Sequence, residues 1–186
     1  MFEFLKANPA VSMLKADHDL VKDLFDQFEA AKSRAAKVKI VRKALTELKV
    51  HAAIEEELFY PSVRAKIGKE IMNEADEEHH VAKLLIAELD VMDGSESHFD
   101  AKFHVLSENV RHHIEEEEGE MLPKAKGVKL DFAALAEKMR RRKERLLADG
   151  VPPVGEEIMV AAAGAKGDSP ALAAKRKAPK LPKRKG

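Results

Sequence analysis

Two copies of one short pattern constrain this chain more than any other feature. Residues 51–61 read His, three residues, Glu, five residues, Pro, and residues 113–123 repeat the same spacing. Residues four apart lie on one face of a helix, so each copy points an imidazole and a carboxylate in the same direction. Two such helices facing each other would hold a pair of metal ions.

The repeat extends beyond these two segments, because a single histidine precedes each copy, at His18 and His79. The repeat unit is therefore a helical hairpin, and two hairpins with short loops predict an up-down four-helix bundle. Each histidine and its partner glutamate interrupt an otherwise apolar helical stripe. The candidate metal ligands are His18, His51, Glu55, His79, His113 and Glu117.

Capping and breaking residues predict an all-α chain with five helices. Asn8 before Pro9 and Asp131 are good helix starts, Pro61 predicts a kink, and Gly68 predicts a stop. No segment alternates as a strand should. The expected helices span about residues 10–31, 36–60 with a last turn to 67, 69–92, 97–121 and 132–148. The expected domains are a bundle over 1–125, an additional C-terminal helix within 126–150, and a disordered basic tail over 151–186.

The absence of cysteine excludes disulfides, thiolate zinc sites and iron–sulfur clusters, so any metal must be held by histidines and carboxylates. The N-terminal residues show no signal-peptide pattern, and no apolar run is long enough to span a bilayer. We therefore expect a cytoplasmic protein that does not enter the membrane.

Charge is distributed unevenly along a chain whose formal net charge is zero. Residues 151–186 carry eight Lys or Arg and three Asp or Glu, which leaves the preceding part with a net charge of −5. The basic clusters 175–177 and 183–185 suggest contact with nucleic acid or an acidic partner. We favour a solubilising tail, because charge runs without aromatic residues are non-specific.

Simpler explanations exist for each residue of the pattern taken alone. A lone buried histidine is usually just hydrogen-bonded, and a glutamate run is usually a solvated face. We expect His80 and His112 to face water. The same is expected of Glu56, Glu57, Glu115, Glu116 and Glu118. None of these explanations accounts for one arrangement that occurs twice in register.

Four imidazoles and two carboxylates suit iron, manganese or zinc. If both carboxylates bridge, each metal has two histidines and two carboxylate oxygens. A solvent-derived oxo or hydroxo bridge would still leave an open position for O₂, peroxide or NO. The ferritin-like di-iron pattern places Glu before His at spacing three, which does not fit this chain.

Over about residues 10–125 the chain resembles the hemerythrin-like, HHE cation-binding domain family. The resemblance implies a four-helix bundle around a non-haem, oxo-bridged di-iron centre, which favours iron over manganese or zinc. The segments that carry it are Asp17-His18, His51-x-x-x-Glu55-Glu56 with Pro61, Glu78-His79, and His113-x-x-x-Glu117-Glu118 with Pro123.

One position departs from the oxygen-carrying members, which have a fifth histidine one turn after the ligand of the third helix. This chain has Lys83 there. The resemblance then implies reactivity with O₂, peroxide or NO in oxidative or nitrosative stress rather than plain oxygen carriage. The alternative is a metal-binding sensor or iron-buffering module without turnover. For Tyr60, the single phenol, we favour a packing role over a redox role.

Overall fold

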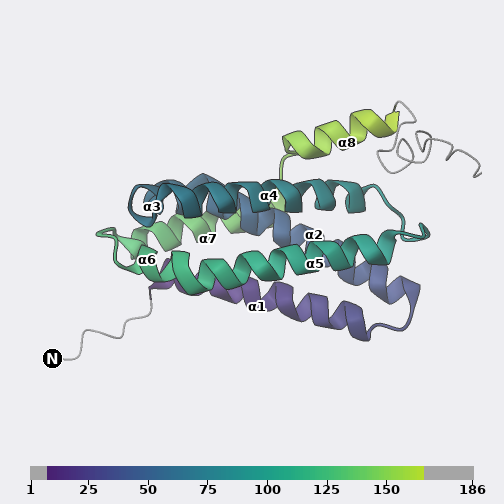
Figure 1. The fold of residues 1–186 in the computed structure, drawn as a ribbon, viewed down its shortest axis with the longest axis horizontal. Coiled ribbons are helices and arrows are strands. Elements are labelled where there is room, and N and C mark those ends of the chain that lie inside the picture. The colour runs from purple at the N-terminus through teal and green to yellow at the C-terminus, as the bar shows by residue number, and fades with distance from the viewer. Residues whose placement is uncertain (1–7, 166–186) are drawn as a thin grey trace, which may run out of the picture.

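The computed structural model describes residues 8–165, and these residues are helical apart from short connections (Figure 1). The two π-helical turns are named η1 and η2. The helices are α1 (Pro9–Ala30), α2 (Arg34–Ile54), η1 (Glu55–Phe59), α3 (Tyr60–Ile67), α4 (Lys69–Asp90), α5 (Phe99–Glu116), η2 (Glu117–Met121), α6 (Leu122–Lys126), α7 (Phe132–Asp149) and α8 (Gly155–Ala165).

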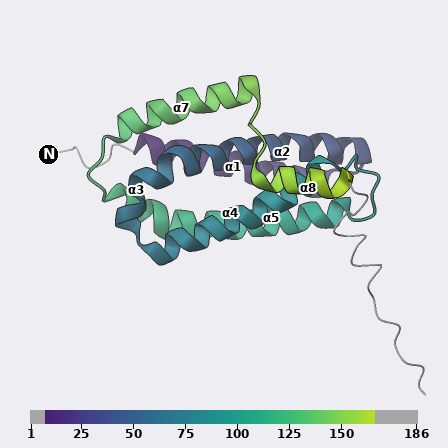
Figure 2. The same cartoon turned by 90° about the horizontal axis from the view of Figure 1, so that it is seen from above.

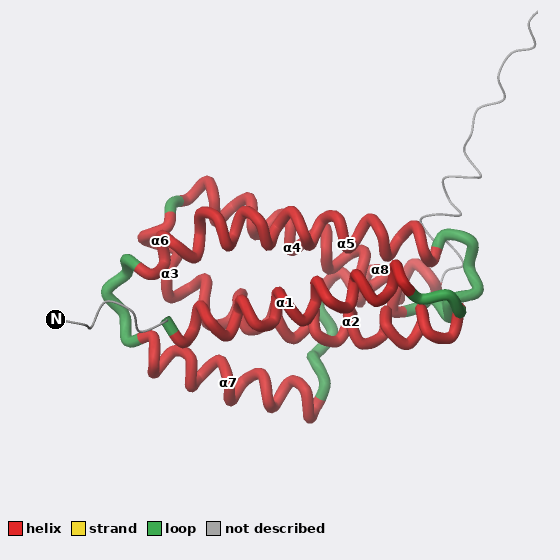
Figure 3. The backbone as a smooth tube through the Cα atoms, turned by 90° about the horizontal axis from the view of Figure 1, so that it is seen from below, coloured by secondary structure: helices red, strands yellow, loops and turns green. Residues whose placement is uncertain are grey.

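The four long helices α1, α2, α4 and α5 form an up-down bundle, as the sequence predicted (Figures 1 and 2). The additional helix α7 lies along α1 and α2 on one side of this bundle, and α8 packs on α4. The tube drawing in Figure 3 shows that short loops join the long helices at both ends of the bundle. The predicted fold class is confirmed.

The predicted helix boundaries follow from local chemistry. The Asn8 side chain accepts hydrogen bonds from the first free N–H groups of α1, and the Asp131 side chain does the same for α7. Gly68 separates α3 from α4 with a φ of 125°, a conformation that side-chain-bearing residues rarely adopt. These caps explain why the helix ends predicted from the sequence lie within a few residues of the observed ones.

The repeated proline of each motif coincides with a feature that the sequence did not predict. Both π-turns begin at the motif glutamate. In each turn a backbone N–H bonds to the carbonyl five residues earlier, from Tyr60 to Glu55 and from Leu122 to Glu117. Proline follows each turn and cannot donate the ordinary helical bond. Single π-turns occur often at functional sites, and here both contain a candidate ligand.

The core has two apolar clusters with a polar layer between them. One cluster joins the N-terminal half of α1 to α3, α6 and α7, through residues such as Leu14, Phe59 and Met139. The other joins the opposite halves of the long helices, through residues such as Phe25 and Phe103. Apolar packing on both sides therefore fixes the helices that carry the polar layer.

One expectation needs correction, because residues 155–165, which we placed in the flexible tail, form α8. Glu156 and Glu157 suit the first turn of this helix. Glu156 lies 2.7 Å from Nδ1 of His80 on α4, and Glu157 pairs with Lys49 on α2. Residues 151–154 form the connection to this helix, and residues 166–186, with the basic clusters, lie outside the described residues. No helix within residues 8–165 is long and apolar enough to cross a membrane.

Candidate metal centre

The structure brings all six predicted site residues together in the polar layer. Each is buried, with no more than 7% of its surface exposed. They form two overlapping groups of donor atoms, and within each group the atoms lie within 4.8 Å of one another. The first group is His18, His51, Glu55 and Glu117, and the second is Glu55, His79 and His113. Glu55 belongs to both.

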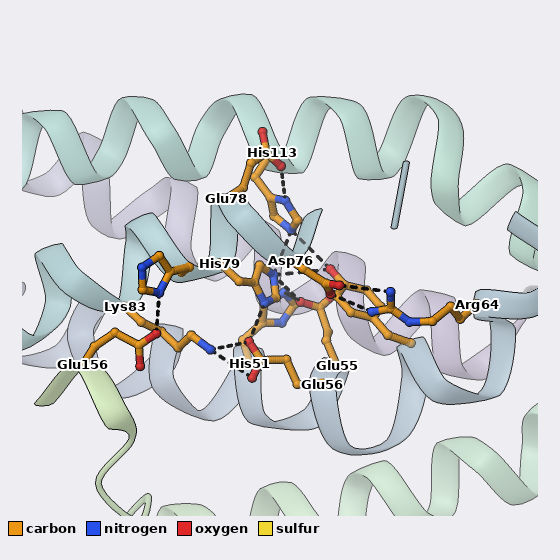
Figure 4. Close-up of polar contacts among 12 residues, drawn as sticks. His51, Glu55, Glu56, Arg64, Asp76, Glu78, His79, Lys83, His113 and Glu156 are labelled. Carbon is orange, nitrogen blue, oxygen red and sulfur yellow. Dashed lines mark hydrogen bonds and ion pairs between the residues drawn. The ribbon is translucent and has the colours of Figure 1, made fainter. Parts of the chain in front are cut away.

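The Nε2 atoms of the four imidazoles point toward the centre of the layer. Nε2 of His18 lies 3.1 Å from Glu117, and Nε2 of His51 lies 3.2 Å from Glu55. Nε2 of His79 lies 3.4 Å from Glu55 and 3.2 Å from Nε2 of His113 (Figure 4). Imidazole and carboxylate donors from four helices thus face one small volume.

The opposite ring nitrogens point outward, and each meets a carboxylate on a neighbouring helix. Each carboxylate is adjacent in sequence to a candidate ligand of its own helix but contacts the histidine of the next one. The pairs are Asp17 with His51 at 3.5 Å, Glu56 with His79 at 3.0 Å, Glu78 with His113 at 2.7 Å, and Glu118 with His18 at 3.0 Å. They close a ring through α1, α2, α4 and α5.

This carboxylate ring favours one nitrogen of each histidine for metal binding, through hydrogen bonds at His18, His79 and His113 and through a longer contact of 3.5 Å at His51. An ionised carboxylate only accepts hydrogen bonds, so it favours the tautomer with the proton on Nδ1. The lone pair on Nε2 is then free and faces the centre. Partners of this kind orient metal-binding histidines in proteins generally.

Two glutamates of the ring correct our expectation of a fully solvated face. Glu56 and Glu118 are only partly exposed, at 36% and 24% of their side chains, and each contacts an imidazole. Burial and hydrogen bonding act in opposite directions on Glu56: burial raises its pKa, but bonds from His79 and Lys83 lower it to about 2. His80 and His112 face water as predicted. Sequence periodicity missed the two glutamates because it does not show how far a side chain reaches toward the next helix.

Lys83, at the position of the missing fifth histidine, does not face the donor groups with its amine. Its Nζ lies 2.9 and 3.1 Å from the two oxygens of Glu56, as Figure 4 shows. The lysine therefore neutralises the carboxylate that holds His79.

Tyr60 reaches the site from the end of η1. Its hydroxyl lies 3.3 Å from Nε2 of His79 and 3.4 Å from Nε2 of His113, and the residue is 1% exposed. Burial and the charge of Glu55 raise its pKa well above the usual range, so the phenol keeps its proton. Beyond the packing role that we favoured, Tyr60 supplies a polar atom to the second donor group.

The charges of the donor groups conflict in this buried setting. Burial and repulsion by Glu117 raise the pKa of Glu55 well above its usual range. Burial alone would lower the pKa of His18, but close contact with the Glu117 carboxylate raises it to about 8. Burial lowers the pKa of His51 to about 4. A divalent cation would resolve this conflict, because it stabilises both carboxylates in their charged form.

Unpartnered donor atoms show that the residues fit a metal. Within residues 8–165, the buried atoms without a hydrogen-bond partner include six that face the centre of the layer: Nε2 of His18, Nε2 of His51, and both carboxylate oxygens of Glu55 and Glu117. The two Nε2 atoms have only ionic contacts, 3.1 Å from Glu117 and 3.2 Å from Glu55. Nδ1 of His51 and Oδ2 of Asp17, which lie 3.5 Å apart, also lack a hydrogen bond. Buried polar atoms normally form hydrogen bonds. Six such atoms without a hydrogen bond in one place therefore indicate a partner that the protein does not supply. Buried nitrogen and oxygen donors without thiolate suit a borderline metal such as iron, manganese or zinc.

A small cavity of about 30 Å³ lies on the histidine side of the site. This space holds about one water molecule or a diatomic ligand. All four candidate histidines line it, together with the apolar side chains Val21, Leu48, Ile86, Val110 and Ile114. Asn109 and Lys83 also border it, and the sequence patterns did not identify Asn109 as a residue of the site.

Comparison with known protein families matches residues 10–125 to the family described as Hemerythrin HHE cation binding domain. Among solved structures, the chain is similar to a Hemerythrin HHE cation binding domain-containing protein from Mycobacterium kansasii, with a TM-score of 0.62 and 26% sequence identity. That similarity covers 79% of this chain and 95% of the other. No curated protein gives a significant match.

Proposed function

Because this chain belongs to the hemerythrin HHE cation-binding domain family, we propose that it binds two iron ions and reacts with O₂, peroxide or NO. In this proposal His18, His51, Glu55 and Glu117 hold one ion. Glu55, His79 and His113 hold the other, with the Tyr60 hydroxyl beside them as a hydrogen-bond donor. A role in the response to oxidative or nitrosative stress follows from such reactivity.

The observation that carries the proposal is the convergence of donor atoms on two adjacent points. Glu55 belongs to both donor groups, and its Oε2 lies near a histidine of each, so its carboxylate could bind both ions. The groups are not equivalent, because Glu117 joins only the first and the Tyr60 hydroxyl lies only at the second. The symmetric set, in which both carboxylates bridge, stays a prediction, and the donor groups favour Glu55 as the shared residue.

Bound iron would supply the redox chemistry, and the protein residues would control what reaches it. The 30 Å³ cavity has room only for a small ligand, and apolar side chains form much of its wall. The Tyr60 hydroxyl is buried at the site and keeps its proton, so it can donate a hydrogen bond at the second ion. The charge of Lys83 is paired with Glu56, which leaves the cavity wall electrostatically neutral there.

Metal analysis together with reactivity tests the proposal. Anaerobically reconstituted protein should contain two iron ions per chain and develop near-ultraviolet absorption on exposure to air. Mixing with peroxide or NO should then change that spectrum and consume the reagent. Fewer than two ions per chain would refute the site. Two ions without any reaction would instead favour the sensor or iron-buffering function.

A further inference from the structure

Lysines neutralise three of the four carboxylates in the ring, and their origins differ. Lys15 on α1 lies 2.6 Å from Glu118, and Lys83 on α4 lies 2.9 Å from Glu56. Both lysines belong to the bundle. The lysine that pairs with Asp17 is Lys143 on α7, which lies outside the segment matched by the family. The additional helix therefore reaches the candidate metal centre.

The contacts form a continuous line from α7 to a candidate ligand. Nζ of Lys143 donates a hydrogen bond to Oδ1 of Asp17, and Oδ2 of Asp17 lies 3.5 Å from Nδ1 of His51. The side chain of Asp17 is 10% exposed and that of Lys143 is 21% exposed. A buried carboxylate needs a cation or hydrogen-bond donors to keep its charge. Lys143 is the cation of the described chain that contacts it.

Apolar packing fixes the position of Lys143. Leu135, Met139 and Leu146 follow one another at helical spacing on α7, and all three are buried in the core cluster that also contains Leu14 and Val50. The lysine extends from the edge of this stripe toward α1. The neighbouring Arg142 instead binds Glu57, a glutamate that contacts no histidine.

We propose that α7 is part of the metal centre and that Lys143 is a positioning residue for the first metal ion. Lys143 holds Asp17 in place, and Asp17 keeps His51 in the ring orientation and tautomer that direct Nε2 to the ion. This inference rests on the proposed function and deepens it. The fifth helix thus contributes to metal affinity at one of the two positions, in addition to covering the core.

Cobalt titration of the full-length metal-free protein tests the proposal, since Co²⁺ reports its ligand field in the visible spectrum. Lys143→Met and Lys143→Gln should each weaken one of two binding steps by roughly tenfold or more, as loss of a partner that orients a ligand typically does. The other step should stay unchanged, and Lys143→Arg should restore both. Arg142→Met is the matched control, because it removes an ion pair from the same helix without touching the ring.

Several results would overturn the proposal. Equal behaviour of the Lys143 and Arg142 variants would do so, as would equal weakening of both steps, which indicates general loss of the scaffold. In an Asp17→Asn background, Lys143→Met should have no further effect, and a further loss of the same size refutes the route through Asp17. Melting temperatures of the metal-free variants verify folding. Wild-type protein that binds fewer than two cobalt ions would refute the proposed function itself.

Discussion

Removal of both metal ions should lower the melting temperature of this protein by clearly more than a few degrees. Six buried ligand atoms have no hydrogen-bond partner in the described chain. An unsatisfied buried polar atom costs about 1–3 kcal/mol, and we take the lower end because proton uptake by Glu55 relieves part of the penalty. Six such atoms then destabilise the metal-free protein by at most about 6 kcal/mol, because the contacts of His18 with Glu117 and of His51 with Glu55 lower the cost.

That free energy converts to a temperature shift through the size of the protein. A chain of 150–250 residues shifts by about 2–4 °C per kcal/mol, so the expected difference is at most roughly 12–24 °C. Mass action gives a similar value. A site held at about 100 times its dissociation constant contributes about 2.7 kcal/mol, and two sites contribute about twice that.

Thermal unfolding followed by circular dichroism, with and without saturating metal, measures this shift. Glu55→Gln is the matched variant, because it keeps the side-chain volume but removes the carboxylate common to both groups. Its melting temperature should not respond to metal. If the wild-type protein binds two ions and its melting temperature changes by less than about 3 °C, the assumed cost of orphaned donors is wrong.

Three further outcomes are expected. Glu55→Ala should abolish binding of both metal ions, whereas His113→Gln should remove only one, which metal analysis per chain would show. Gly94→Ala should destabilise the fold by about 1–3 kcal/mol in urea unfolding, because φ is +93° and the new Cβ would collide with Cγ2 of Val38. An unchanged midpoint contradicts this packing. Since the pKa of Glu56 is lowered to about 2, its bonds stabilise the fold above its unfolded pKa of 4.5 and are lost as pH falls toward 2. Between pH 4.5 and 2 the Glu56→Gln variant should therefore lose less stability than the wild-type protein. If both proteins show the same dependence of unfolding free energy on pH, the stabilising role of the Glu56 bonds is refuted.

The fold and the donor set were both accessible from the sequence, for reasons that particular residues make clear. Asn8, Gly68 and Asp131 mark helix ends by local backbone chemistry, which does not depend on the rest of the molecule. The spacing of His51 and Glu55 predicts a shared helix face, since α-helical geometry is uniform. The repeat then shows that the facing helices carry matching groups.

The contacts between helices could not be predicted from the sequence. The ring of outer carboxylates, the position of Tyr60 and the docking of α8 depend on how each helix is rotated and shifted against its neighbours. A helical residue next to an inward-facing ligand can point to solvent or reach the adjacent helix, and Glu56 does the latter. Local sequence contains no information that separates these cases.

The sequence by itself thus determined which residues are the candidate ligands and that they share one bundle. Only the tertiary structure decided how those ligands are oriented. The clearest example is Lys143, which meets Asp17 across a separation of 126 residues. That meeting depends on apolar packing of α7 against the bundle, and such packing fixes side-chain contacts only once the whole core has assembled.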